Sequence, residues 1–142
     1  MIEAIIEGVA ARIHDEFGPG YEIYSGQIKQ GLAPPCFLVT CVSSAATLEV
    51  GRRSYHRNLF SVKYFAASKV DARSECDAVC VRLLRQLETI KLESGPLRGT
   101  ERNAQYIDDA LVVTVNYNHY SIAPADESDP MAELAQTVGT KG

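Results

Sequence analysis

The sequence predicts an α+β fold in which two helices pack on one face of an antiparallel β-sheet. Residues 2–17 and 72–88 carry apolar side chains at steps of three and four, the period of an amphipathic helix. The segments between and after them alternate apolar and polar residues, as a half-buried strand does. Short turns separate these strands, and short turns join antiparallel neighbours.

The first predicted helix ends at Gly18-Pro19-Gly20, because proline cannot continue a helix and glycine accepts left-handed dihedral angles. A short strand is expected at 21–24. The next strand, 36–43, follows two prolines that cannot donate hydrogen bonds to a ladder. Residues 44–51 are predicted to form a loop, and 55–65 a strand with one buried face.

The second predicted helix begins after Asp71, a plausible N-cap, with Glu75 as a charge partner for its N-terminus. Short strands are expected at 90–93 and 97–107. The strongest strand is 110–121, which forms a hairpin with the preceding one through the turn Asp108-Asp109. One core is expected to join both helices and this last strand; its members are Ile5, Ile6, Val9, Leu83, Leu84, Val113 and Val115.

The length of 142 residues predicts one domain over 1–122, followed by an acidic flexible tail over 123–142. The tail has four acidic residues and one lysine, a net charge of −3, so the rest of the chain carries −1 of the total −4. This balance argues against nucleic-acid binding as the main task. No apolar run is long enough to span a membrane, and the N-terminus lacks the pattern of a secretion signal, so the expected location is the cytosol.

Nothing in the sequence indicates catalysis, a cofactor or a metal site. The histidines, His14, His56 and His119, have no obvious orienting carboxylate nearby in sequence, and no phosphate-binding or nucleophile motif is present. The four cysteines lack the C-x-x-C spacing of a zinc site, and reduced core side chains are the expectation for them.

A group of arginines and tyrosines is more suggestive, since both residue types are enriched at protein interfaces. The alternative is a solvated strand face. The suspected subunit or partner interface comprises Arg52, Arg53, Tyr55, Arg57, Arg98, Arg102 and Tyr106.

Three phrases together resemble a family of phage tail terminator proteins, found in tailed phages and prophages of Gram-positive bacteria. They are residues 27–38, residues 56–65, and residues 95–100 leading to 113–117. The likeness spans about residues 1–122. Ala66-Ala67 stands where the family pattern has a proline, which affects only the local loop geometry.

The resemblance implies a structural virion protein. Such subunits form a hexameric ring that caps the tail tube, ends tail polymerisation and provides the docking surface for the head-neck connector. The implied partners are copies of the chain, the tail tube protein, the sheath protein and the connector, with DNA passing through the lumen unbound. Two alternatives stay open: a head-tail adaptor ring, and a small cytosolic enzyme with a site at the sheet edge.

Overall fold

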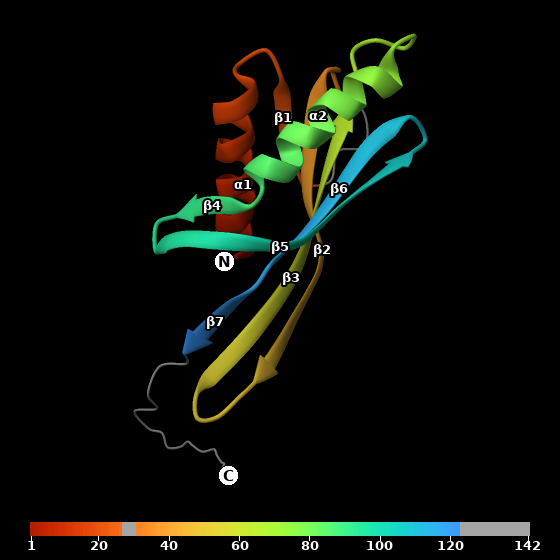
Figure 1. The fold of residues 1–142 in the computed structure, drawn as a ribbon. Coiled ribbons are helices and arrows are strands. Elements are labelled where there is room, and N and C mark those ends of the chain that lie inside the picture. Colours follow the sequence, from red (N-terminus) through yellow and green to blue (C-terminus); the bar gives the residue numbers. More distant parts are fainter. Residues whose placement is uncertain (27–30, 123–142) are drawn as a thin grey trace. The chain divides into compact units, whose positions relative to one another are not determined.

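The computed structural model describes residues 1–26 and 31–122, so the predicted acidic tail lies outside the described residues. It consists of two helices and a curled, mixed sheet, which confirms the α+β class (Figure 1). The elements are α1 (Ile2–Phe17), β1 (Glu22–Ser25), β2 (Cys36–Leu48), β3 (Arg53–Phe65), α2 (Ala72–Gln86), β4 (Thr89–Leu92), β5 (Gly95–Ile107), β6 (Ala110–Tyr117) and β7 (His119–Ile122).

The described chain divides into two compact units. Unit 1 holds residues 1–45 and 57–119, and unit 2 holds residues 46–56 together with the chain from Tyr120 onward. Unit 1 contains both helices and most of the sheet. None of the helices in the described chain is long and apolar enough to cross a membrane.

The strand order in the sheet is β1-β2-β3-β6-β5-β4, with β7 also pairing with β3. The pairs β3–β6, β5–β6 and β4–β5 are antiparallel, as predicted. The pair β1–β2 is parallel, with Glu22 opposite Cys36, so the expectation of a wholly antiparallel sheet is wrong at this edge. The connection between these two strands is long enough to return the chain to the same end of the sheet, which a short hairpin turn does not do.

Two strand boundaries also differ from the predictions. The expected loop at 44–51 is mostly strand, since β2 continues to Leu48 and only a tight turn follows, in which the Glu49 N–H donates to the Arg53 carbonyl at 2.7 Å. The single strand expected at 110–121 is interrupted at Asn118, where β6 ends and β7 begins.

A buried asparagine organises the end of β6. Asn58 is 2% exposed, and its amide nitrogen donates to the Tyr117 carbonyl at 3.0 Å. Its carbonyl oxygen accepts a hydrogen bond from the Ser44 hydroxyl at 2.7 Å, and its backbone N–H donates to the Asn118 side chain at 3.1 Å. Because a buried amide is costly unless it is hydrogen-bonded, this network holds β2, β3 and the end of β6 in one arrangement.

The apolar stripes of both helices and alternate residues of the central strands form one core, as predicted. Ile5, Val9, Leu83, Val113 and Val115 are fully buried, while Ile6 and Leu84 pack against the core from its margin. Two aromatic side chains, Phe17 of α1 and Phe37 of β2, meet with ring centroids 4.9 Å apart. The helices therefore cover the same face of the sheet.

The start of α2 is held differently from the prediction. Asp71 occupies the N-cap position, but its side chain makes no capping hydrogen bond. Glu75 instead accepts hydrogen bonds from the Tyr64 hydroxyl at 2.5 Å and from the backbone N–H groups of Ala67 at 2.8 Å and Ser68 at 3.3 Å. Burial opposes ionisation of Glu75, yet these three donors outweigh it and lower the pKa of the carboxyl.

The end of α2 lies directly against β5 and β6. The Tyr117 hydroxyl donates to the Leu87 carbonyl at 2.7 Å, and the Gly99 N–H donates to the Glu88 carbonyl at 2.7 Å. A Cβ atom on Gly99 would lie 2.4 Å from the Leu87 carbonyl oxygen, so only glycine permits this approach.

All four cysteines are free thiols, as expected. Cys36 and Cys76 are buried, and Cys41 and Cys80 are half-buried. Burial raises the pKa of each of the four thiols.

Candidate interaction surface

The face of the sheet opposite the helices is polar and is built by strand register. In unit 1, Leu59 of β3 lies opposite Asn116 of β6, which lies opposite Thr100 of β5. The next row joins Ser61, Thr114 and Asn103. Because side chains alternate across a strand, these residues project away from the core that Phe60, Val62, Val113 and Val115 form. We call this surface the open face.

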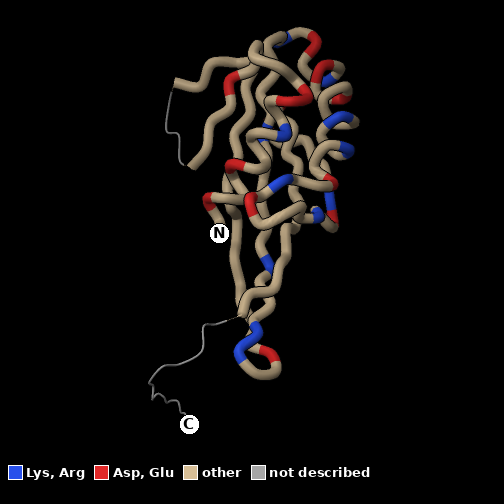
Figure 2. The backbone as a smooth tube through the Cα atoms, turned by 90° about the vertical axis from the view of Figure 1, so that its left-hand side faces the viewer, with Lys and Arg blue, Asp and Glu red and all other residues tan. Residues whose placement is uncertain are grey.

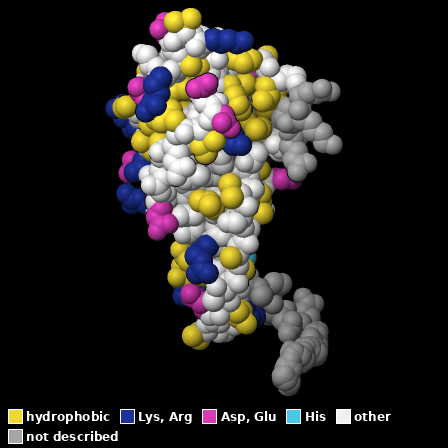
Figure 3. All heavy atoms as spheres, turned by 90° about the vertical axis from the view of Figure 1, so that its right-hand side faces the viewer, with side chains coloured by type: hydrophobic (Ala, Val, Ile, Leu, Met, Phe, Trp, Pro, Cys, Tyr) yellow, Lys and Arg dark blue, Asp and Glu magenta, His cyan; other side chains and the backbone are white. Residues whose placement is uncertain are grey.

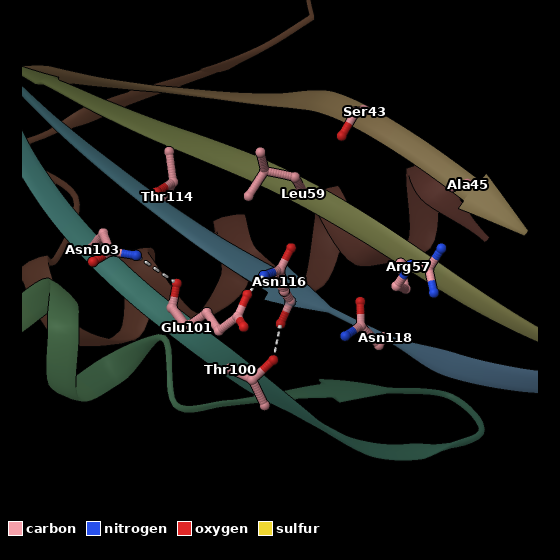
Figure 4. Close-up of a pocket in the computed structure, with 10 residues that line it drawn as sticks. All are labelled: Ser43, Ala45, Arg57, Leu59, Thr100, Glu101, Asn103, Thr114, Asn116 and Asn118. Atoms are coloured by element: carbon pink, nitrogen blue, oxygen red, sulfur yellow. Dashed lines mark hydrogen bonds between the residues drawn. The ribbon is translucent and has the colours of Figure 1, made fainter.

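The open face contains a groove with a volume of about 630 Å³ (Figure 4). The strands β2, β3, β5 and β6 and the residue after β6 all contribute to it. Its lining residues are Ser43, Ala45, Arg57, Leu59, Thr100, Glu101, Asn103, Thr114, Asn116 and Asn118.

A bulge in β5 shapes one wall of the groove. The register between β5 and β6 shifts between Thr100 and Asn103, and Glu101 at this bulge has a positive φ of 52°. The Glu101 carboxylate accepts a hydrogen bond from the Asn116 side chain at 2.6 Å, and its backbone carbonyl accepts one from the Asn103 side chain at 3.2 Å (Figure 4). These bonds hold the polar side chains in place within the subunit.

The groove has little charge. Arg57 and Glu101 are the charged residues that line it, and the remaining lining residues are uncharged. Figure 2 shows a different pattern on α2, which carries several basic and acidic residues, while long stretches of the strands are uncharged. Uncharged amide and hydroxyl groups beside exposed backbone suit hydrogen bonding to another protein surface, because they carry a low desolvation cost.

One polar atom of the open face is buried and unpaired. Ser61 is 3% exposed, and among the described residues its hydroxyl oxygen has no hydrogen-bond partner. Buried hydroxyl groups are nearly always hydrogen-bonded, so this one is unusual. Its oxygen is covered by the subunit itself and therefore does not offer a contact to a partner.

The suspected interface residues fall into separate groups. In unit 2, the Arg53 guanidinium lies over the ring of Tyr120, 4.3 Å from its centroid, and the rings of Tyr55 and Tyr120 are 4.7 Å apart. Arg52 is exposed in the same unit. In unit 1, Arg57 lines the groove of the open face.

The other three suspected residues contact α2 or the residues just after it. Arg98 pairs with Glu88 at 3.5 Å, with both side chains exposed. Arg102 donates to the Leu84 carbonyl, and the Tyr106 hydroxyl donates to Asp77. These contacts lie within the subunit, so the role of these residues toward a partner stays a prediction.

Sequence reasoning missed most of the open face. The signal was present in β6, where Val112, Thr114 and Asn116 alternate with buried apolar residues. Val112 itself is half-buried. Arg53 and Tyr55 were predicted by residue type, but their stacking with Tyr120 depends on how β7 pairs with β3.

The described residues hold no group of three or more His, Cys, Asp or Glu side chains that could bind a metal ion. The arrangement is that of a small α+β subunit with a well-packed core and a polar surface suited to protein contact. The family model for the phage tail terminator protein matches residues 4–129, and the chain belongs to that family. This membership makes it a structural component of a phage tail.

No curated protein matches the chain. Among the solved structures that match, one has a TM-score of 0.42 and 11% sequence identity over 88% of this chain and 94% of the other. A score at this level carries no argument about function.

Proposed function

We propose that the chain closes into a hexameric ring that caps the tail tube, ends tail polymerisation and presents a docking surface to the head-neck connector. Membership of the tail terminator family supports a role at the tail. The observation that carries the finer proposal is the open face, a polar, largely uncharged surface that the subunit's own helices leave uncovered.

The mechanism is geometric and needs no catalysis. A closed ring repeats one contact around a symmetry axis, so each subunit offers the tube an identical binding site. The partners are copies of the chain, the tube protein, the connector and, in a contractile tail, the sheath. DNA passes through the lumen, and the low net charge of residues 1–122 lets it slide without tight binding. Assembly takes place in the host cytoplasm, and the final location is the neck region of the virion.

The deciding experiment removes the gene from a producing phage and examines the particles by electron microscopy. Tails of uncontrolled length that do not join heads are the expected result, and expression of the wild-type chain in trans should restore normal particles. Tails of normal length beside unjoined heads would instead identify a head-tail adaptor. Normal particles would overturn the proposal.

A further inference from the structure

The sheet of unit 1 has two open backbone edges. β3 pairs with the inner edge of β2, and β1 pairs with its outer edge only over Cys36–Val39, so the outer edge of β2 from Thr40 to Ala45 has no strand neighbour in the described chain. At the other side of the sheet, β4 pairs with β5 only over Gly95–Arg98. Beyond the bulge in β5, the outer edge from Asn103 to Ile107 is likewise without a strand neighbour in the described chain (Figure 1).

The bulge in β5 ends just before Asn103, and within the two open segments the other features that normally prevent strand pairing are missing. Proteins protect exposed edges with lysine, proline, bulges or inward-pointing charges. Residues 40–45 read Thr-Cys-Val-Ser-Ser-Ala and residues 103–107 read Asn-Ala-Gln-Tyr-Ile, without a charge, a proline or a glycine. Each edge also exposes an apolar side chain, with Val42 at 55% and Ile107 at 49%.

The two edges have matching directions. β5 and β3 both run antiparallel to β6, so β5 and β3 run the same way. β2 and β3 are adjacent strands joined by a tight turn, which makes them antiparallel. β2 and β5 therefore run in opposite directions within one subunit. If copies are related by rotation about an axis along the strands, β2 of one copy is also antiparallel to β5 of the next.

We propose that the occupant of each edge is a second copy of this chain, with Thr40–Ala45 of one subunit pairing antiparallel to Asn103–Ile107 of its neighbour. The chain itself supplies both halves of the contact, and both are uncharged, similar in length and opposite in direction. Because the two edges are different surfaces, the contact is head-to-tail, the type that closes into a ring. The inference deepens the proposed function and rests on it, since it names the surface through which the ring closes.

The surface between the edges fits this arrangement. On the face drawn in Figure 3, uncharged polar side chains and backbone (white) together with hydrophobic side chains (yellow) cover more of the surface than charged side chains do. Backbone pairing between copies satisfies alternate N–H and C=O groups along both edges, as in strand addition to an exposed sheet.

Cysteine cross-linking tests the pairing directly. Ser43 and Gln105 are exposed, and directly opposed residues of antiparallel strands have Cβ atoms about 4.5–5.5 Å apart, close to the separation a disulfide spans. The Ser43→Cys chain is mixed with the Gln105→Cys chain under mild oxidation. The Asn103→Cys chain tests a pairing shifted by two residues, because Asn103 and Gln105 lie two residues apart and project to the same side.

The expected result is a covalent dimer on a non-reducing gel only when the two variants are mixed. Each variant alone should run as a single chain on the same gel, which controls for disulfides from the four native thiols. The matched control mixes Ser43→Cys with Ser74→Cys, an exposed position on α2, and should give no dimer. The double variant Ser43→Cys/Gln105→Cys should give a covalent ladder that stops at the closed ring. Self-dimers of Ser43→Cys, or equal yields with Ser74→Cys, would overturn the pairing.

Native mass spectrometry of the same samples separates this inference from the proposed function. Rings that form without the mixed cross-link overturn the edge pairing and leave the proposed function standing. If the purified chain stays monomeric, particles from cells that produce both variants are the deciding sample. Capped tails without the cross-link overturn the pairing, whereas tails of normal length in the absence of the chain overturn the proposed function.

Discussion

The two faces of strand β6 carry different side chains: one face is apolar and buried, and the other is mostly polar. Its residues Leu111, Val113 and Val115 are fully buried beneath the helices, while Thr114 and Asn116, which alternate with them, lie on the open face. The first set stabilises the subunit by removing apolar surface from water. The second set contributes little to that core, and in the proposed ring it belongs to the surface available for contact with other chains. Because side chains alternate along the strand, substitutions on the two faces should have different consequences.

Truncating a side chain of the core between the helices and the sheet should have the largest effect on stability. Leu83 is fully buried in the core, so Leu83→Ala should lower the free energy of unfolding by about 2–5 kcal/mol, as core truncations do. Denaturant unfolding measures the change. Val81→Ala, at a position 59% exposed on the same helix, should change it by less than about 0.5 kcal/mol. Equal losses at both positions would show that the helix does not pack as described.

Adding a methyl group at Gly99, where β5 approaches the residue after α2, should also destabilise the subunit. In Gly99→Ala the new Cβ would meet the Leu87 carbonyl oxygen at 2.4 Å and a Val115 methyl at 2.8 Å, neither of which can move without disturbing the core. We expect a loss of about 1–3 kcal/mol, measured by thermal unfolding. Gly20→Ala, with open space around its Cβ, is the matched control and should leave the melting temperature nearly unchanged.

The hydrogen-bonded Glu75 carboxylate should make the free energy of unfolding depend on pH in the acidic range. Its folded pKa is lowered, so it stabilises the fold above its unfolded value of about 4.5, and this contribution is lost as the pH falls through the folded value. Glu75→Gln should cost about 1 kcal/mol at pH 7 and progressively less below pH 4.5, as hydrogen bonds to the charged form disappear. Unfolding measured across pH 3–7 tests this. If the difference in unfolding free energy between the wild-type chain and Glu75→Gln did not change with pH, the role of the carboxylate would be contradicted.

Charge reversal on exposed arginines should have the smallest effect on stability and a large effect on assembly. Arg57 is exposed beside the groove and Arg98 is exposed in its pair with Glu88, so Arg57→Glu/Arg98→Glu should change unfolding by about 0.5 kcal/mol or less. The same variant should fail to restore normal tail length in a phage that lacks the gene. Normal tails would show that these two arginines are only solvated.

The fold class, the two helices and the core residues could be predicted from the sequence, because they depend on the periodicity of apolar residues. The stripes of α1 and α2 and the alternation in β3 and β6 predicted which side chains are buried. It was not sufficient for the parallel pairing of β1, because four residues carry no directional signal. The extension of β2 to Leu48 was missed because small and polar residues such as Ser43 and Ala45 resemble a loop until a neighbouring strand pairs with them.

The interaction surface was less accessible to sequence reasoning than the fold. Arginines and tyrosines were chosen by residue type, but Arg102 and Tyr106 bind groups of α2 within the subunit. The groove combines residues from four strands that are distant in sequence, and only the register brings Leu59, Asn116 and Thr100 into one row. An open backbone edge has no residue signature at all, since it depends on which strands lack a neighbour.

The buried thiols have a practical chemical consequence. Thiolates, not thiols, react with maleimides and oxidants, and burial keeps Cys36, Cys41, Cys76 and Cys80 protonated by raising the pKa of each. At neutral pH the buried Cys36 and Cys76 should therefore be modified slowly, whereas a cysteine introduced on the solvent-exposed surface reacts at the ordinary rate. Placing a fluorophore or spin label at an introduced cysteine, to follow the subunit during tail assembly, then requires replacement of only the half-buried Cys41 and Cys80.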